Sequence, residues 1–246
     1  MASTSSQTTP LEPTLYSLLP PSLHTSILSH LSLLAIHAEP LHLIERIYTT
    51  TNPVLPGQTR NLRFRSIRIA GTVRDKGKGK EKDDGDWVHT LAYVSSRLRS
   101  AEYSEAAVRA VMSVEVQDMS SSRDIEDFVK ALGFRYVTYS LFHCSSLTLD
   151  SRHSHTFTLT GHLLHLPIPI PTSPPLTLHL SITRLTPSAS TTNEQSAPDE
   201  PYLVQLQPSR PVYAIAPPGD IGLQDMIGVM QSTAGRLDGL EWSTGQ

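Results

Sequence analysis

The feature that most constrains the fold is a succession of strand-like runs, separated by turn signals. After residue 154 the runs HTFTLTGHLLHL, LTLHLSITRL and PYLVQLQ follow one another, with a proline cluster at 167–175 and a polar insertion between them. Strands that follow strands in this way indicate an antiparallel sheet. Five earlier runs bring the count to about eight, the number at which such a sheet readily closes into a barrel. These earlier runs lie at 15–19, from Leu41, from Asn61, at 87–97 and at 110–117.

A few helices are expected beside this sheet. Ser22 can cap a first helix, which carries Leu23, Ile27, Leu31 and Leu34 on one face. A last helix starts near Asp220, with Leu223, Met226, Ile227 and Met230 on one face and Gly228 as a weak point. The sequence therefore predicts an α+β fold that is mainly β: an antiparallel barrel of about eight strands, flanked by a few helices.

The middle helix lies in DIEDFVKALGFRYVTYSLFH, residues 124–143, where the hydrophobic period changes from that of a helix to that of a strand. Gly133 is expected to end the helix, because a helix stop often needs a left-handed residue. The acidic head supports a helix N-terminus, where negative charge meets the helix dipole. The expected apolar helix face is Ile125, Phe128, Val129 and Leu132, and the strand that follows places Val137, Tyr139 and Leu141 opposite Tyr136, Thr138, Ser140 and Phe142.

The domain organisation is expected to be simple. Residues 1–13 are rich in Ser, Thr and Pro and are predicted to be a disordered tail, followed by one barrel domain over 14–242. Two polar segments, 73–86 and 187–201, are predicted to be disordered insertions. The Lys-rich part at 74–82 has two other interpretations, a nuclear localisation signal or a phosphate-binding patch, but glycines and acidic residues interrupt it.

Composition excludes several classes of protein. The net charge is −3 and the pI is about 6.4, so no basic field indicates direct binding to DNA or to an anionic membrane. There is no secretion signal and no apolar run long enough to span a membrane, and we expect a soluble intracellular protein. The single cysteine, Cys144, excludes an internal disulfide framework and a multi-cysteine zinc site. We expect it to be a small buried strand residue, with a reactive thiol as the alternative.

The order of these elements resembles the subunit 18 family of the Mediator complex of RNA polymerase II transcription. The segments that carry the resemblance are YSLLPPSLHTSILSHL, WVHTLAY, VEVQDMSSSRDIEDFVKALGFRYVTYSLFH and PYLVQL, followed by a proline-glycine turn and an amphipathic helix. They cover most of residues 14–242 in pieces, and the helix ending in Leu-Gly-Phe is the most specific of them. This chain has in addition a longer Ser/Thr-rich N-terminus and the two insertions.

The resemblance implies a barrel related in shape to the triphosphate tunnel enzymes, and a nuclear, noncatalytic coactivator subunit of the Mediator head module. It also implies pairing with Mediator subunit 20, capture of a C-terminal helix of Mediator subunit 8, and contact with other head subunits and RNA polymerase II through the complex. A triphosphate tunnel phosphohydrolase and a carrier of lipid or another small ligand in the lumen remain alternatives.

A hydrolase tunnel needs carboxylates for divalent metal and cations for phosphate oxygens. On strands these would alternate as E-x-E or K-x-R. Glu39 and Glu45 are too far apart to form such a pair, Glu115 is alone in its strand, and no acidic residue occurs between Ser151 and Asn193. Arg63 and Arg65 share a strand face and Arg68 takes the other. The pattern therefore favours a binding module over an enzyme.

Histidines offer a second route to chemistry. His153 and His155 could place two imidazoles on one strand face, with His162 and His165 nearby in sequence. His162 and His165 differ by three positions and so point to opposite faces, which favours polar strand positions over a zinc site. There is no Gly-rich phosphate loop and no G-x-S-x-G motif. We therefore assign no catalytic, cofactor-binding or metal-binding residue, and the sequence does not identify partner-binding residues.

Overall fold

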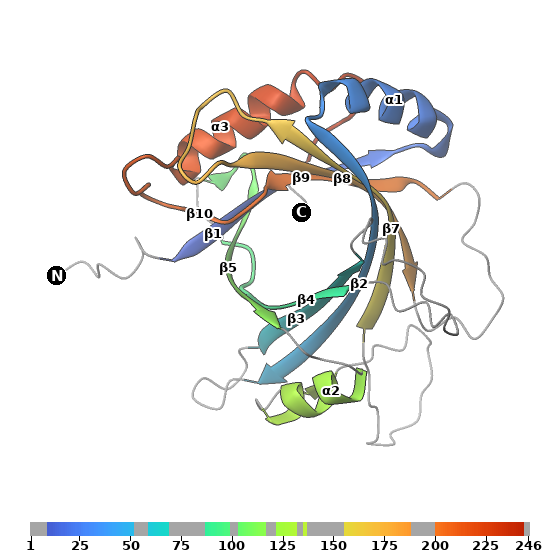
Figure 1. Ribbon diagram of the computed structural model, residues 1–246, viewed down its shortest axis with the longest axis vertical. Helices are drawn as coiled ribbons and strands as arrows, with labels where there is room; N and C mark the ends of the chain where they lie inside the picture. Colours follow the sequence, from blue (N-terminus) through green and yellow to red (C-terminus); the bar gives the residue numbers. More distant parts are fainter. Residues whose placement is uncertain are drawn as a thin grey trace, which may run out of the picture.

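The structure, a computed structural model, shows a closed antiparallel β-barrel with helices on its outer surface (Figure 1). It describes residues 9–51, 59–68, 87–98, 103–116, 122–131, 135–136, 155–187 and 200–243. Around the barrel the strands follow the order β1-β5-β4-β3-β2-β7-β8-β9, and β9 pairs with β1 to close the ring. The predicted fold class is therefore confirmed.

Each of the eight barrel strands corresponds to a run that the sequence predicts, although the bounds differ. Two further short strands extend the sheet: β6 (Arg135–Tyr136) pairs with β2, and β10 (Val212–Tyr213) pairs with β1. The barrel strands are β1 (Pro10–Leu19), β2 (His37–Thr51), β3 (Thr59–Arg68), β4 (Trp87–Val94), β5 (Ala107–Val116), β7 (His155–Pro167), β8 (Thr177–Pro187) and β9 (Tyr202–Pro208).

The first strand corrects the predicted domain boundary. β1 begins at Pro10, and Pro10 and Leu11 pair with β10 while Leu11 to Thr14 pair with β5. Residues 10–13 therefore belong to the barrel, and the prediction that they lie in a disordered tail is wrong. The strand at the second insertion likewise extends further than expected, because β8 runs to Pro187. Residues 73–86 and 188–199 lie outside the described residues, as does Cys144.

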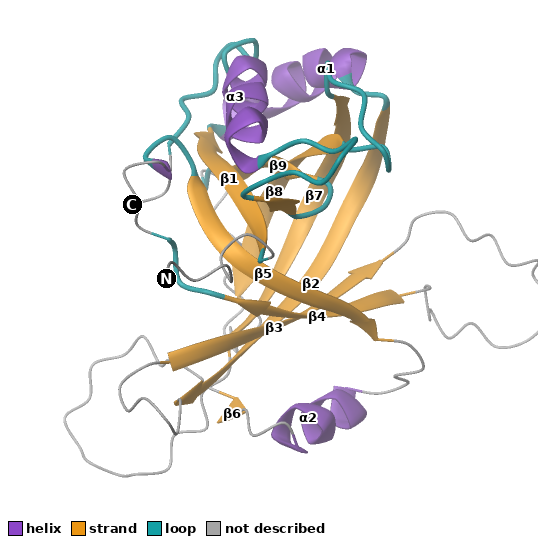
Figure 2. Ribbon diagram, turned by 90° about the vertical axis from the view of Figure 1, so that its left-hand side faces the viewer, coloured by secondary structure: helices purple, strands orange, loops and turns teal. Residues whose placement is uncertain are grey.

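Helices α1 (His24–Leu34) and α3 (Leu223–Ala234) lie next to each other over the outer face of β1, β7, β8 and β9, with α1 against β7 (Figures 1 and 2). The predicted face of α3 is confirmed, since Leu223, Met226, Ile227 and Met230 are all buried. These residues pack against the outward side chains of the strands, among them Leu178, Leu180, Val204 and Leu206. The main hydrophobic core therefore lies outside the barrel, between its wall and these two helices.

The start of α1 differs from the prediction. A short 3-10 helix, Pro21–Leu23, precedes it, so Leu23 is the N-cap and Ser22 caps nothing. Of the predicted apolar face, Leu31 is buried and Ile27 packs against the core, whereas Leu23 and Leu34 are exposed. α3 also starts later than expected: its N-cap is Gly222, and Asp220 instead holds Arg210 through two hydrogen bonds of 2.8 Å.

The helix predicted in the middle of the chain is α2 (Ser122–Ala131), on the opposite side of the molecule (Figure 2). Val129 is fully buried against the outer face of β2, β3 and β4, where it contacts a cluster of Tyr48, Leu62, Phe64 and Leu91. Phe128 remains 41% exposed. Gly133, Leu132 and residues 137–143 lie outside the described residues, so the predicted glycine stop and most of the predicted aromatic strand stay predictions. None of the helices that the structure describes is long and apolar enough to cross a membrane.

Candidate functional site in the barrel lumen

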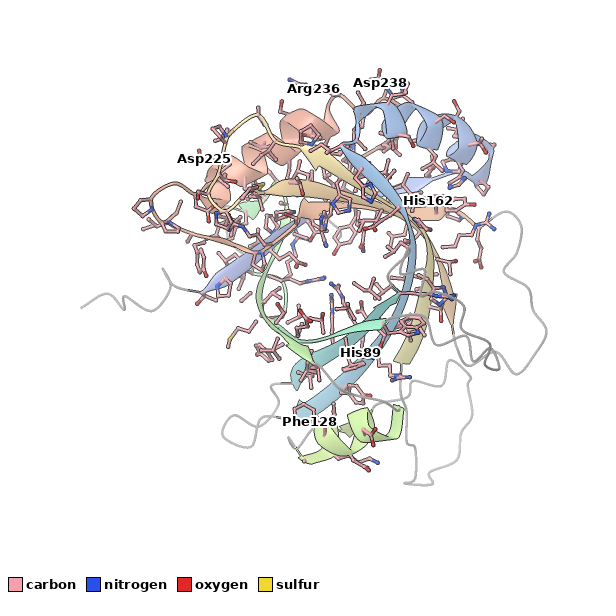
Figure 3. All side chains as sticks on the ribbon, in the orientation of Figure 1. His89, Phe128, His162, Asp225, Arg236 and Asp238 are labelled. Atoms are coloured by element: carbon pink, nitrogen blue, oxygen red, sulfur yellow. The ribbon has the colours of Figure 1, made fainter. Side chains whose placement is uncertain are left out.

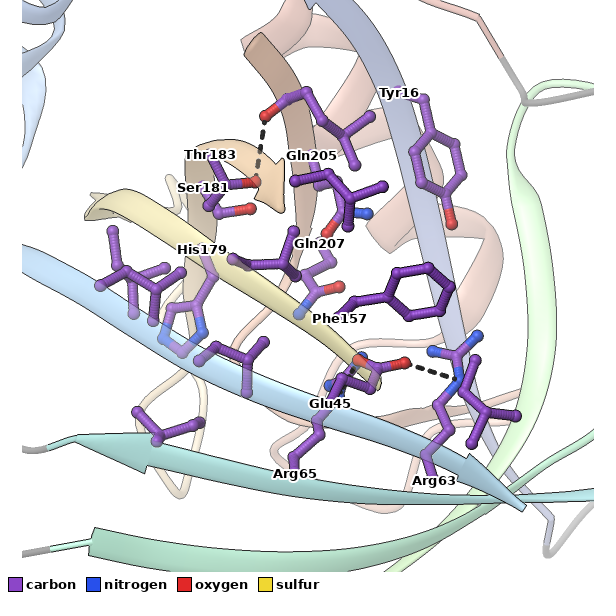
Figure 4. A pocket seen from close by; sticks show the side chains of 18 of the residues that line it. Tyr16, Glu45, Arg63, Arg65, Phe157, His179, Ser181, Thr183, Gln205 and Gln207 are labelled. Atoms are coloured by element: carbon purple, nitrogen blue, oxygen red, sulfur yellow. Dashed lines mark hydrogen bonds and ion pairs between the residues drawn. The ribbon is translucent and has the colours of Figure 1, made fainter. Parts of the chain in front are cut away.

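The barrel encloses a cavity of about 300 Å³ (Figure 4), lined by side chains from all of its strands except β4. Because neighbouring residues in a strand point to opposite faces, every second residue faces this lumen. One part of the lining is apolar, with Leu41, Leu43 and Phe157, and another carries amides and hydroxyls, with Gln205 and Thr183. The lumen is therefore the main candidate site for a small ligand.

A cluster of charges lies at one side of the cavity. The carboxylate of Glu45 accepts a hydrogen bond from Nε of Arg65 at 3.0 Å, and its other oxygen lies 3.4 Å from Nε of Arg63. Arg109 donates to the hydroxyl of Tyr16 at 3.4 Å. Arg63 and Arg65 thus share one strand face, as predicted, and the structure shows that it is the inner one. Arg68 lies on the outer face, where it is exposed.

The pKa shifts of Arg63 and Arg65 show how burial and the neighbouring charges act on these two side chains. Burial is the main cause that lowers the pKa of Arg63; Arg65 and Arg109 lower it too, while Glu45 and Glu12 raise it without reversing the shift. Burial also works against the charge of Arg65, but Glu45 and Glu12 raise its pKa overall. The cluster therefore holds more positive than negative charge, and Glu45 is central to it.

Sequence reasoning missed several of these residues. Glu12 was placed in the tail, but it lies on β1 directly opposite Arg109 in the strand register. Tyr16, Arg109 and His179 come from three strands far apart in sequence, so no local motif joins them. The only signal was the alternation of each strand, which fixes the face of a residue but not its neighbours.

Three histidines and one carboxylate meet where β2 begins. Nε2 of His165 lies 3.1 Å from one oxygen of Glu39, and Nε2 of His37 lies 3.8 Å from the other. The ring of His179 meets that of His165 edge to face, with centroids 4.6 Å apart. Burial, together with repulsion from the nearby His165, lowers the pKa of His179 to about 4, although Glu39 opposes this shift. His179 is therefore neutral at pH 7.

The histidines that the sequence singled out do not form one site. His162 and His165 point to opposite faces, as predicted. His162 lies beneath α1 (Figure 3), 5.9 Å from the ring of His24, and His165 faces the inner side, where it meets Glu39. His153 lies outside the described residues. Within the described part of the chain, no group of three or more His, Cys, Asp or Glu side chains is arranged to hold a metal ion.

The carboxylates are likewise spread out. Glu45 is the one carboxylate among the described residues that line the cavity, Glu39 lies with the histidines, and Glu115 is exposed on β5. Hydrolysis of a triphosphate at a divalent metal ion needs several oxygen ligands around one point. Glu45 is already paired with two arginines, so these donors do not fit such a metal site. What the arrangement offers chemically is cationic and neutral hydrogen-bond donors.

Comparison with known proteins gives a likeness in fold alone. No protein family and no curated protein matches this sequence. The chain is similar to a chain in the structure of the Schizosaccharomyces pombe Mediator head module, with a TM-score of 0.50 and 13% identity over 94% of this chain and 97% of that one. It is similar at the same TM-score, with 11% identity over 96% and 94% of the two chains, to the PH1819 protein from Pyrococcus horikoshii OT3.

A weaker match is the Mimivirus capping enzyme triphosphatase, with a TM-score of 0.38 and 7% identity over 92% and 89% of the two chains. The neighbours thus include a triphosphatase as well as a Mediator head chain. At these identities the two matches with a TM-score of 0.50 show a likeness in fold alone, over 94% or more of each chain.

Proposed function

We propose that this chain is a noncatalytic subunit of a nuclear Mediator head module, of the subunit 18 kind, which docks other subunits and supports regulated transcription by RNA polymerase II. The observation that carries the proposal is the likeness to a chain of the S. pombe head module over nearly the full length of both chains. The sequence segments that resemble the subunit 18 family support it independently.

The lumen supports a noncatalytic role. Its charged side chains are committed to one another, with Glu45 held between Arg63 and Arg65. A carboxylate in this position neutralises two buried cations and has little capacity left to bind a metal ion. The ion cluster therefore stabilises the barrel wall, and docking takes place at the outer surface.

The test is coexpression with Mediator subunit 20 and the C-terminal segment of Mediator subunit 8, followed by size-exclusion chromatography. We expect one stoichiometric complex that contains all three chains. A matched control carries serine in place of the apolar residues of the subunit 8 segment, and this segment should be lost from the complex. Elution of the three chains as separate species would refute the proposal, as would release of phosphate from nucleoside triphosphates with Mg²⁺ or Mn²⁺.

A further inference from the structure

Strand β5 has a half-open edge. On one side its residues 111–116 pair with β4. On the other side β1 pairs only with the first four residues of β5, from Ala107 to Ala110. Beyond Ala110, no described residue pairs with this second side of β5. The half of β5 beyond Ala110 therefore resembles an edge strand, because the backbone amides and carbonyls on its second side have no strand partner among the described residues.

The hydrogen bonds that β5 already makes identify which backbone groups face the open side. The carbonyl of Ala110 accepts from the amide of Ser95 at 2.9 Å, and the carbonyl of Val108 accepts from the amide of Leu98 at 2.8 Å. Even-numbered residues therefore direct their amides and carbonyls toward the β4 side. Because these groups alternate along a strand, the amides and carbonyls of Ser113 and Glu115 point to the open side.

A groove runs along this edge on the outer surface. It has a volume of about 570 Å³ and is bordered by β5 and by Pro10 and Tyr213, and it extends over the outer faces of β3 and β4 at Leu62 and Leu91. The outward side chains of β5 that border it are apolar and exposed, Met112 at 65% and Val114 at 60%. An extended segment added beside the open half of β5 would therefore border this groove.

We propose that this edge accepts an extended segment of a partner chain, which adds to the barrel as a strand beside Ser113 and Glu115. The inference rests on the proposed docking function and identifies the surface that performs it. Backbone groups of the added strand would satisfy those of Ser113 and Glu115, while its outward side chains would pack on Met112 and Val114. The partner segment should therefore carry apolar residues at alternate positions.

Charge adds a second requirement on the partner. Glu115 is exposed on the inner face, opposite Thr90 in the register, and forms no ion pair with any residue that the structure describes. A lysine or arginine between the apolar positions of the added strand would meet this carboxylate. The segment MASTSSQT, which precedes Thr9, has neither the apolar alternation nor a basic residue. The chemistry of the edge thus fits another chain better than this chain's own N-terminus.

The test uses the coexpressed complex with subunit 20 and the subunit 8 segment, and one substitution that blocks only the open side. Ser113→Pro removes an amide that points away from β4, so the barrel should fold with an unchanged melting temperature. Affinity for the partners should fall at least tenfold. Met112→Glu should weaken the complex in the same way. Leu33→Glu, on α1, where the leucine is 84% exposed, is the matched control and should leave the affinity unchanged.

Amide hydrogen exchange measures directly whether the backbone amides of this edge are hydrogen-bonded. The amides of Ser113 and Glu115 should exchange rapidly in the free chain and become protected in the complex. A synthetic peptide of alternating valine and lysine serves as a second probe and should protect the same two amides. If the complex does not form but the peptide protects both amides, the proposed function fails and the edge assignment stands.

Three results would overturn the edge assignment. One is wild-type affinity of Ser113→Pro for the partners in a complex that does form. Another is the absence of protection at Ser113 and Glu115 with both partners and peptide. The third is protection of these amides in the free chain that disappears when residues 1–8 are deleted, or when the chain is diluted from a dimer, because the occupant would then be the N-terminus or a second copy.

Discussion

An alanine at Gly161 should force apart the barrel wall between β7 and β8. A Cβ atom at this position would collide with the carbonyl oxygen of Ile182 and lie 2.9 Å from Cα of Thr183. Both are backbone atoms, so no side-chain rotation relieves the contact. Overpacking of this kind costs about 1–3 kcal/mol, and each ladder hydrogen bond that lengthens costs about 1 kcal/mol more. We expect Gly161→Ala to lower the free energy of unfolding by about 3 kcal/mol.

The same substitution at Gly228 provides the control. Gly228 lies within α3, and a Cβ there would meet no atom within 4 Å. Because glycine disfavours a helix interior, Gly228→Ala should raise the free energy of unfolding by about 0.5–1 kcal/mol. Urea denaturation followed by far-UV circular dichroism measures both variants. A loss below about 1 kcal/mol at Gly161, or effects of the same sign at both sites, would refute the reasoning about close strand approach.

Three further outcomes follow from the ionic groups. Glu45→Gln removes the carboxylate that pairs with both Arg63 and Arg65. It should lower the free energy of unfolding by about 3 kcal/mol, measured by urea titration, and a change near zero would show that the ion pairs are not needed. His179 binds a proton less readily when folded, with a pKa of about 4, than at its ordinary pKa of 6.5. Protonation therefore favours the unfolded chain, and stability should fall as the pH drops from 6.5 to 4; His179→Gln should flatten that part of the thermal-melt profile, and an unchanged profile would contradict it. The hydrogen bonds from Arg210 lower the pKa of Asp220 below 3.8. The ionised carboxylate therefore stabilises the fold above pH 3.8, and this stabilisation is lost as the pH falls below that value. Asp220→Asn should remove this acid dependence, and an identical acid transition in the variant would assign the dependence to other carboxylates.

Much of the fold could be predicted because each barrel strand is a long alternating run bounded by turn signals. LTLHLSITRL illustrates this, since its outward leucines form part of the core beneath α3 while His179, Ser181 and Thr183 face the lumen. The apolar face of α3 followed from helical spacing for the same reason. In both cases the burial of a residue depends on the period of its own segment.

The start of β1 could not be predicted in this way. Its first residues, PLEP, contain two prolines and read as a tail, because proline cannot donate to a sheet ladder. Their pairing partners are Val212 and Tyr213, two hundred residues away in sequence, and the first half of β5. Glu12 was lost from the candidate site together with this strand. The two prolines do disfavour a strand locally, but pairing with the distant strands β5 and β10 places these residues in the sheet all the same.

The charge cluster was only partly predictable. Alternation placed Arg63 and Arg65 on one face, but which face is the lumen, and which carboxylate lies opposite, depends on the neighbour of the strand. Glu45 meets Arg65 because β2 pairs with β3 with these two residues directly opposite. Arg109 approaches the same cluster across the lumen. Sequence alone could therefore rank residues as inward or outward but could not assemble the site.

The open edge of β5 is a consequence of how the barrel closes. β1 is a single strand of ten residues that pairs with β5 through Leu11 to Thr14 and with β9 through Leu15 to Leu19. The strands of a closed barrel are staggered. Strand β1 is short, and it therefore pairs with one neighbour through its first half and with the other neighbour through its second half. The half of β5 beyond Ala110 then lies past the start of β1. The same stagger that lets the short strand β1 close the barrel thus leaves part of β5 without a strand partner among the described residues. The free backbone donors and acceptors of β5 can then bind an added strand while β1 still pairs with both of its neighbours.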